Sequence, residues 1–187
     1  MKYIVHKPYF NYEKEENWLN QMSAKGMALT DYSWCRYVFE EVANSQYIYR
    51  IEMLENAPTS VEGRAYLKFL EENNVDCVAT YMSWAYLRKK SSEGSFDIYS
   101  DIDSRIKHYQ RVTTLWNIFM WIELIVGFIN LLIGGLHVWG IINLSGIAVY
   151  NLFIGSICMG LGVLLCGLRI PFIKKLKQLK REKVIRE

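Results

Sequence analysis

The stretch that decides the fold is LWNIFMWIELIVGFINLLI at residues 115–133, followed after a loop by IAVYNLFIGSICMGLGVLLCGL at residues 147–168. The first stretch contains one formal charge, Glu123, and the second contains none. At a rise of about 1.5 Å per residue, each helix would be close to the ~30 Å thickness of a bilayer hydrocarbon core. Two such stretches in succession predict a transmembrane helical hairpin.

Positive charges lie before the first stretch and after the second, which is the same side of the predicted hairpin. Residues 105–111 hold three cations before the first stretch, residues 169–187 hold eight after the second, and the loop at 134–146 contains no Lys or Arg. Segments with an excess of Lys and Arg stay on the cytoplasmic side of a membrane. We therefore expect a two-span protein of the cell membrane, with both termini in the cytoplasm and the loop outside.

The charge is divided unevenly along the chain. The 187 residues have a net charge of +3, but residues 1–100 hold 11 Lys and Arg against 14 Asp and Glu, a net charge of −3. Residues 169–187 hold eight cations against two acids, a net charge of +6. Because a nucleic-acid-binding domain is expected to present a basic face, this distribution argues against direct contact with nucleic acid.

The first 90 residues alternate between helical and strand patterns. The segment EKEENWLNQMSAK at 13–25 places Trp18, Leu19 and Met22 at helical spacing, and Gly26 follows as a stop signal. Later segments rich in Tyr, Trp, Val and Ile alternate with polar residues as strands do. In chain order the patterns predict a helix at 13–25, an antiparallel strand pair at 29–39 and 46–54, a helix at 60–73, and a short strand pair at 77–82 and 84–88.

The two helices and the segments that follow them resemble each other. WLNQMSAKGMAL at 18–29 aligns with YLKFLEENNVDC at 66–77, so that Leu19 matches Leu67 and Gly26 matches Asn74. This alignment predicts a duplicated helix-strand-strand unit with a period near 48 residues. With a leading strand at 3–6, the order becomes β-α-β-β-α-β-β, an α+β arrangement close to a ferredoxin-like sandwich with an added strand.

Polar and charged segments mark the boundaries between regions. The run KKSSEGS at 89–95 is typical of a linker, and residues 101–112 have the pattern of a helix that continues into the first span. The predicted regions are a cytoplasmic α+β domain at 1–90, a linker and juxtamembrane helix at 91–113, a transmembrane hairpin at 114–170 and a basic cytoplasmic tail at 171–187.

Several quoted stretches carry a family resemblance. They are FNYEKEENWLNQMSAKGMAL at 10–29, YIYRIE at 47–52, YLKFLEENN at 66–74 and VATYMSWAYLRKK at 78–90. Together they resemble DUF2812, a bacterial membrane-protein family of unknown function, over about residues 2–90. Members are often encoded beside PadR-like transcription regulators, so the resemblance implies a regulatory setting and a PadR-like regulator as partner. It implies no catalytic residues, and Met27 stands where the family pattern has an aromatic residue.

Aromatic residues are the candidates for partner binding. On strand alternation, Tyr32 and Trp34 share one face and Tyr37 and Phe39 share the other. If the helices cover one side of the sheet, an aromatic face remains for a partner protein or an apolar ligand. The alternative is that the rings form the core or lie on the lipid surface. The candidate residues are Trp18, Tyr32, Trp34, Tyr47, Tyr49, Trp84 and Tyr86.

The hairpin contains a polar seam. An ionised acid near the bilayer midplane, such as Glu123, is costly, and it is usually protonated, paired or turned toward protein. Small residues let two helices approach closely, so we interpret the seam as packing within the hairpin or between hairpins of a homo-oligomer. The alternative is a proton or cation site. The seam consists of Glu123, Asn130 and Asn151, with Gly127 and Gly134 on the first span and Gly155, Cys158 and Gly162 on the second.

The tail after the second span is predicted to contact lipid. A cation cluster beside a span attracts anionic headgroups with about 1 kcal/mol per cation near the surface. The alternative is that the cluster only sets the topology. The cations nearest the span in this cluster are Lys174, Lys175, Lys177, Lys180 and Arg181.

No enzyme signature is present in the sequence. It has no GxSxG, P-loop, HExxH or Gly-rich nucleotide fingerprint, and its four cysteines form no CxxC pair. We predict a non-enzymatic protein with no catalytic residue, metal or cofactor. The predicted function is a membrane-anchored regulatory or sensing module that binds a cytoplasmic protein. The alternative is a small oligomeric transporter, or an accessory subunit of one, that uses Glu123.

Overall fold

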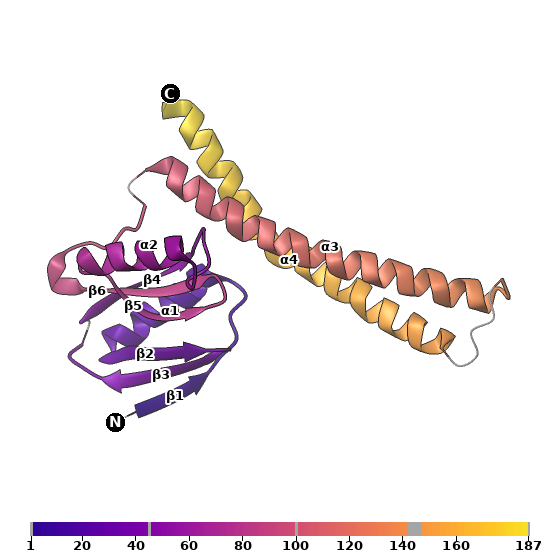
Figure 1. The fold of residues 1–187 in the computed structure, drawn as a ribbon, viewed down its shortest axis with the longest axis horizontal. Helices are drawn as coiled ribbons and strands as arrows, with labels where there is room; N and C mark the ends of the chain where they lie inside the picture. Colours follow the sequence, from indigo (N-terminus) through magenta and orange to yellow (C-terminus); the bar gives the residue numbers. More distant parts are fainter. Residues whose placement is uncertain (1, 45, 100, 142–146, 187) are drawn as a thin grey trace. The chain divides into compact units, whose positions relative to one another are not determined.

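The computed structural model describes residues 2–44, 46–99, 101–141 and 147–186. The chain divides into two compact units, residues 1–108 and residues 109–187. The first unit is α+β and the second consists of long apolar helices (Figure 1). The predicted α+β class and the following helical hairpin are therefore confirmed. Residues 142–146 of the predicted outer loop lie outside the described residues.

The first unit contains two β-α-β-β halves. The first half is β1 (Lys2–His6), α1 (Tyr12–Ala24), β2 (Met27–Ser33) and β3 (Arg36–Glu41), and the second half is β4 (Tyr47–Met53), α2 (Val61–Glu72), β5 (Asp76–Tyr81) and β6 (Trp84–Lys90). A short 3₁₀ turn, η1 (Ser91–Glu93), follows. Each half forms a three-stranded antiparallel sheet in the same order, β1-β3-β2 and β4-β6-β5. The predicted duplication is confirmed, and it includes a strand before each helix.

Three backbone features recur 48 residues apart in the two halves. They are a left-handed residue after the helix (Gly26, φ 78°, and Asn74, φ 62°), a β-bulge in the following strand (Leu29/Asp31 and Cys77/Ala79) and a left-handed residue in the hairpin turn (Trp34, φ 37°, and Met82, φ 52°). Left-handed conformations are unfavourable for most L-residues, so their recurrence at matched positions indicates one template used twice.

The helices begin at capping side chains. Asn11 accepts hydrogen bonds from the N–H groups of Glu13 (2.9 Å) and Lys14 (3.2 Å) at the start of α1. Ser60 accepts one from Gly63 N–H (2.9 Å) at the start of α2. These bonds satisfy N–H groups that have no partner within the helix. The helices predicted at 13–25 and 60–73 are confirmed.

One predicted strand pair is wrong. The segment at 29–39 is itself a hairpin, β2 and β3, which turns at Trp34 and Cys35, and β4 pairs with β6 instead of β3. Short hairpin turns usually contain Gly, Asn or Asp, so a Trp-Cys turn has no sequence signal. The strands therefore form two sheets where one was predicted. The short strand pair predicted at 77–82 and 84–88 is confirmed as β5 and β6.

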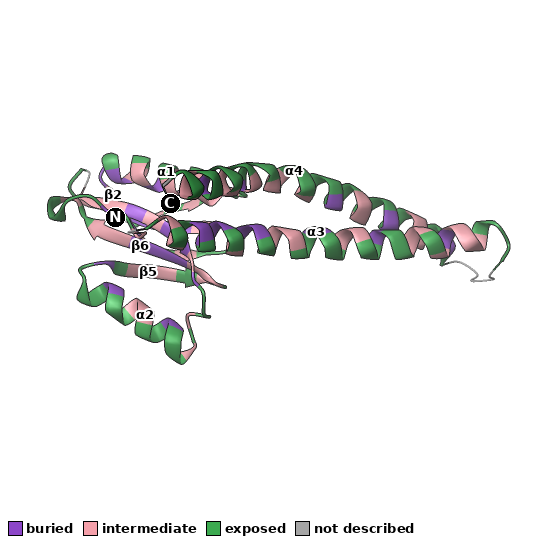
Figure 2. Cartoon of the chain, turned by 90° about the horizontal axis from the view of Figure 1, so that it is seen from above, coloured by how far each residue is buried: buried purple, intermediate pink, exposed green. Residues whose placement is uncertain are grey.

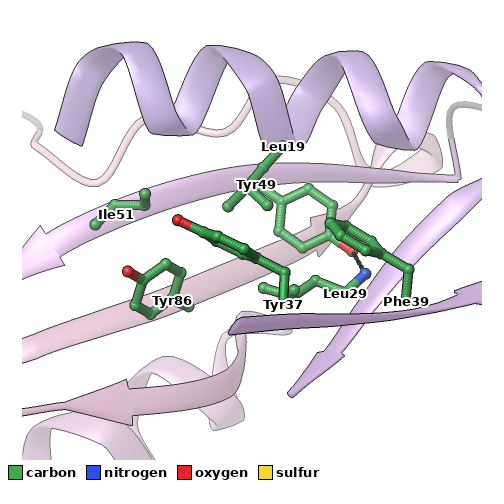
Figure 3. Packing of buried hydrophobic residues seen from close by; sticks show 7 residues of the cluster. All are labelled: Leu19, Leu29, Tyr37, Phe39, Tyr49, Ile51 and Tyr86. Carbon is green, nitrogen blue, oxygen red and sulfur yellow. Dashed lines mark hydrogen bonds between the residues drawn. The ribbon is translucent and has the colours of Figure 1, made fainter. Parts of the chain in front are cut away.

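The main core of this unit is shared by both halves. The repeat-equivalent strands β2 and β5 lie side by side. The Tyr49 hydroxyl accepts a hydrogen bond from Leu29 N–H at 2.8 Å and so links β4 to the bulge of β2. Burial of large aromatic rings between the sheets supplies apolar contact over a wide area. The core residues, shown in Figure 3, are Leu19, Leu29, Tyr37, Phe39, Tyr49, Ile51 and Tyr86.

The second unit is a pair of long helices that pack through glycines. The helices are α3 (Ile102–Val138), which begins within the first unit, and α4 (Ala148–Arg186). A Cβ on Gly127 would lie 3.1 Å from the Gly155 carbonyl oxygen, and one on Gly155 would lie 3.0 Å from the Gly127 carbonyl oxygen. The two backbones therefore approach closely at this point. Further along, Trp116 stacks on Phe172 with 6.3 Å between ring centroids.

Most apolar side chains of these two helices are exposed. Each helix contains an apolar window of 18 residues, of which only 17% is buried in α3 and 11% in α4. Figure 2 shows exposed residues along both helices. The core helix of a soluble protein would bury most of such a window. Both helices are long and apolar enough to cross a membrane.

Candidate functional site

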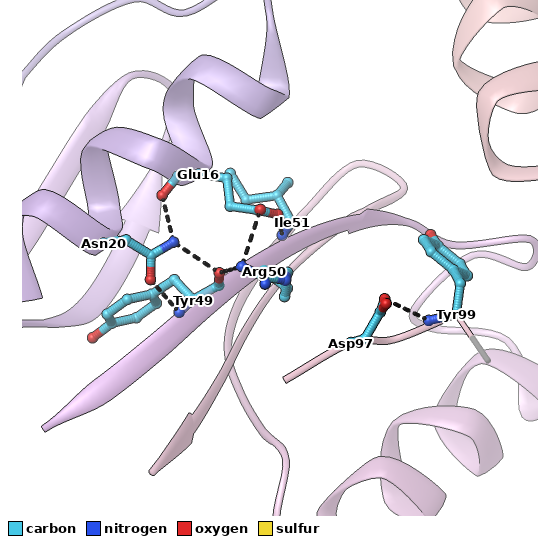
Figure 4. Close-up of polar contacts among 7 residues, drawn as sticks. All are labelled: Glu16, Asn20, Tyr49, Arg50, Ile51, Asp97 and Tyr99. Carbon is cyan, nitrogen blue, oxygen red and sulfur yellow. Dashed lines mark hydrogen bonds and ion pairs between the residues drawn. The ribbon is translucent and has the colours of Figure 1, made fainter. Parts of the chain in front are cut away.

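In the first half of the N-terminal domain, helix α1 covers the free edge of a strand. Glu16, Asn20 and Ser23 lie on one face of α1 and bond to the backbone of β4. Figure 4 shows the contacts of Glu16 and Asn20. The hydrogen bonds are Ile51 N–H to Glu16 Oε2 (3.0 Å), Tyr49 N–H to Asn20 Oδ1 (2.8 Å), Asn20 Nδ2 to the Tyr49 carbonyl (3.1 Å), Ser23 Oγ to the Tyr47 carbonyl (2.6 Å) and Tyr47 N–H to Ser23 Oγ (3.3 Å). A helix thus protects a sheet edge that would otherwise attract another strand.

The repeat places a different set of side chains on the same face of α2. Arg64, Lys68 and Glu71 follow Glu16, Asn20 and Ser23 by 48 residues, with the same helical spacing. These three side chains line an open groove of about 700 Å³. The face that carries β4 in the first half therefore borders open space in the second.

The floor and walls of the groove come from α2, β5 and β6. Arg88 on β6 is held in place by three contacts: Nε donates to Asp76 Oδ2 (3.1 Å), Nη1 donates to the Leu29 carbonyl (3.3 Å), and the guanidinium lies over the Tyr47 ring (4.5 Å). The lining consists of Arg64, Leu67, Lys68, Glu71, Asp76, Cys77 and Arg88.

The charges of the groove favour an anionic ligand. Three cations line it against two acids, Glu71 and Asp76, and Asp76 is already paired with Arg88. Lys68 is exposed and makes a 3.9 Å ion pair with Glu72, which is weak at an exposed site. Arg64 donates to the carbonyl of Thr59. Lys68 is thus the cation that is most readily turned toward a ligand.

Nucleophilic or metal chemistry is not indicated in this groove. Burial raises the pKa of the Cys77 thiol to about 11, so the thiol stays protonated near neutral pH. Among the residues that the structure describes, no three His, Cys, Asp or Glu side chains gather at a distance suited to a metal ion.

Comparison with protein-family models shows where this architecture belongs. The model described as "Protein of unknown function (DUF2812)" matches residues 11–121, more than half of the chain. The chain belongs to the DUF2812 family. The resemblance found in the sequence is confirmed. No curated protein and no solved structure matches this DUF2812 chain.

A buried acid joins the two halves of the DUF2812 domain. Tyr37 of β3 and Tyr86 of β6 both donate to Glu15 Oε1 on α1, at 2.6 and 2.7 Å. Burial raises the pKa of Glu15, and the two tyrosine bonds offset part of that rise. Burial and the neighbouring Glu15 also raise the pKa of both tyrosines. The cluster ties three elements together through a satisfied polar network.

The aromatic residues singled out in the sequence occupy several different environments. Tyr49 (0% exposed) and Tyr86 (3%) belong to the core and are unavailable to a partner. Three others pack against a neighbouring ring. Between ring centroids, Tyr32 lies 4.2 Å from Tyr86, Trp18 lies 4.8 Å from Tyr37 and Trp84 lies 5.5 Å from Tyr12. Tyr47 lies under Arg88. Trp34, in the β2-β3 turn, is 75% exposed. They do not form one exposed sheet face.

The polar seam residues of the DUF2812 hairpin are half-buried. Glu123 on α3 interacts with the Cys158 thiol on α4. Asn130 Nδ2 donates to the Val126 carbonyl of its own helix at 2.8 Å, and Asn151 is half-buried. Near the other end of the hairpin, Arg169 donates to Asn117 Oδ1. Polar groups of both helices therefore lie on or near the line of glycine contact.

The tail cations lie on the last turns of α4. Phe172 and Leu179 are buried on this part of the helix. Of the cations predicted to face lipid, Lys174, Lys177, Lys180 and Arg181 are exposed, whereas Lys175 is half-buried and shares the helix face of Phe172 and Leu179.

Sequence reasoning missed the groove residues. Arg64, Lys68 and Glu71 look like the ordinary solvent face of an amphipathic helix. A signal was present in the repeat, because the matched positions of α1 are Glu16, Asn20 and Ser23. This change of residue type points to an open helix face only when it is known that β4 lies against α1.

Proposed function

We propose that this DUF2812 chain is a membrane-tethered, non-enzymatic regulatory or sensing module that binds a cytoplasmic protein through its N-terminal domain. The observation that supports this most directly is the open, charged groove along α2. Ligand sites are usually concave and contain a few polar groups that converge on the ligand. The two apolar helices supply the tether.

The proposed topology places both termini in the cytoplasm. Its support is the excess of Lys and Arg before α3 and at the end of α4. The tail cations would then face anionic lipid headgroups, in particular those that are exposed on α4. A membrane-impermeant thiol reagent tests this topology on variants that carry a single cysteine at position 2 or position 180. In intact cells neither cysteine should be labelled, and labelling at either position would contradict the topology.

The proposed partner is a cytoplasmic regulatory protein. The family resemblance favours a PadR-like transcription regulator, which would carry the DNA contact that the acidic N-terminal domain is unsuited to make. The module would then respond at the membrane and act through the partner.

Site-specific photo-crosslinking in the native membrane tests partner binding. A photoreactive amino acid at position 68, in the groove, should give an adduct with a cytoplasmic protein that mass spectrometry identifies. The matched control is position 14, another exposed lysine, on helix α1. No adduct at position 68, or the same adduct at both positions, would contradict a partner site in the groove.

The alternative function, a small transporter, depends on Glu123. The interaction of Glu123 with Cys158 beside the Gly127–Gly155 contact favours a role in helix packing. We therefore expect Glu123→Gln to change the stability of the full chain in detergent by less than about 0.5 kcal/mol. Proton flux into proteoliposomes that disappears in Glu123→Gln would favour transport instead.

A further inference from the structure

The α1–β4 contact shows what geometry the groove along α2 can accept. Residues four apart on a helix are separated by about 6 Å along its axis, and residues two apart on a strand by about 6.6–6.8 Å. Side chains at spacings of four and three on a helix face can therefore each reach alternate backbone positions of a strand. Asn20 and Ser23 do this to Tyr49 and Tyr47.

Every residue that lines the groove has a counterpart at this contact or in the strands beside it. The counterparts, 48 residues earlier, are Glu16, Leu19, Asn20, Ser23, Ala28, Leu29 and Glu40. Leu19 and Leu29 are fully buried in the first half, whereas Leu67 and Cys77 are only half-buried in the second. The second half thus has the helix face and the apolar floor of a strand-binding site, with part of that floor still open to solvent.

The charged residues define the strand that would fit. Glu16 and Asn20 accept N–H groups from β4, but their counterparts Arg64 and Lys68 are donors only. They would bond to carbonyl oxygens and to carboxylate side chains of an incoming strand. Glu71, at the position of Ser23, can accept an N–H group. From Arg64 to Glu71 the helix rises about 10 Å, which equals the rise over about three residues of an extended strand.

We infer that the groove along α2 binds an extended, acidic segment of the cytoplasmic partner, in the way that β4 lies along α1. This inference rests on the proposed function and specifies the chemistry of the partner. The strand of a second copy that corresponds to β4 is β1, KYIVH, and its Lys2 and His6 are a poor match for a groove in which cations are in excess. Charge complementarity therefore favours the partner segment over a homodimer.

Selection from a peptide library tests the inference. The full chain, in nanodiscs of phosphatidylcholine, which has no net charge, is presented with a phage library of random decapeptides. Enriched peptides should lack proline and carry Asp or Glu at alternate positions. Synthetic versions should bind Lys68→Glu at least tenfold more weakly and Lys14→Glu with unchanged affinity. Selection on Lys68→Glu should shift toward basic peptides. Lys68 is exposed, and a melting temperature equal to that of the parent confirms that the variant is folded.

Three results would overturn the inference. They are no enrichment above the phage background, enriched peptides whose affinity is insensitive to Lys68→Glu, and a concentration-dependent crosslink from position 68 to β1 of a second copy. In either of the first two cases, a photo-crosslink from position 68 to a cytoplasmic protein would leave the proposed function standing. Only the inference that the partner segment is extended and acidic would then be rejected. If that adduct is absent as well, both fail.

Discussion

The two halves of the N-terminal domain share strand order, bulge position and turn position, yet their helices have different neighbours. Helix α1 bonds to the edge of β4 through Glu16 and Asn20, whereas the matched Arg64 and Lys68 of α2 line an open groove. A duplicated fold thus contains one helix face that is used internally and one that is available. In two similar backbones, a few side chains on one helix face therefore decide whether that face bonds to a strand of the same domain or borders an open groove.

The largest expected effect comes from removing the α1–β4 contact. Asn20→Leu leaves the N–H of Tyr49, a buried residue, without its partner and removes one of two donors to the Tyr49 carbonyl, which keeps Arg50 Nη1 at 3.0 Å. It should lower the free energy of unfolding by about 2–3 kcal/mol. The matched Lys68→Leu should change it by less than about 0.5 kcal/mol, since Lys68 is exposed. Chemical denaturation of the full chain in detergent and hydrogen exchange of residues 47–53 measure both. Equal effects of the two substitutions would remove the distinction between the halves.

A second comparison exchanges the residues that end the two helices. Gly26→Asn should cost about 1–3 kcal/mol, because a Cβ there would lie 2.6 Å from Asn44 Oδ1 and 2.8 Å from the Val42 carbonyl oxygen. The reciprocal Asn74→Gly should change stability by at most about 0.5 kcal/mol, because both residues tolerate φ 62°. Thermal unfolding of the full chain tests both. A loss on Asn74→Gly as large as that on Gly26→Asn would show that the two positions are not equivalent.

The smallest expected effect concerns the acid that joins the halves, and it depends on pH. Because burial raises the pKa of Glu15, the folded state holds this proton more tightly than the unfolded state does. The stability of the parent should therefore fall as pH rises from the ordinary pKa of 4.5 through the raised pKa of the folded state. Glu15→Gln cannot titrate and should lose this part of the pH dependence.

Melting temperatures of the parent and Glu15→Gln between pH 4 and pH 8 provide the measurement. The difference, variant minus parent, should increase as pH rises. Tyr86→Phe is the matched control: it removes a bond that lowers the pKa of Glu15, so the window should extend to higher pH. Parallel pH profiles for the parent and Glu15→Gln would mean that Glu15 does not link the halves through a buried charge.

Local chemistry made much of the fold predictable. Both helices of the N-terminal domain were found from their residue patterns, with Gly26 as the stop signal of the first, and the 48-residue period was found from matched segments around Gly26 and Asn74. The β2-β3 hairpin was missed, because Trp34 and Cys35 adopt left-handed conformations without the usual turn residues. The groove was missed because solvent-facing charges on a helix carry no information about which strand lies opposite.

The sequence by itself determined the two apolar helices, their charged flanks, the α+β class of the first unit and its internal repeat. These properties depend on helix length, side-chain periodicity and charge, all of which are local. Only the tertiary structure decided that Tyr49 and Tyr86 belong to the core, that β4 lies along α1, and that the matched face of α2 borders an open groove. Those outcomes depend on pairing between residues far apart in the chain, which no local pattern specifies.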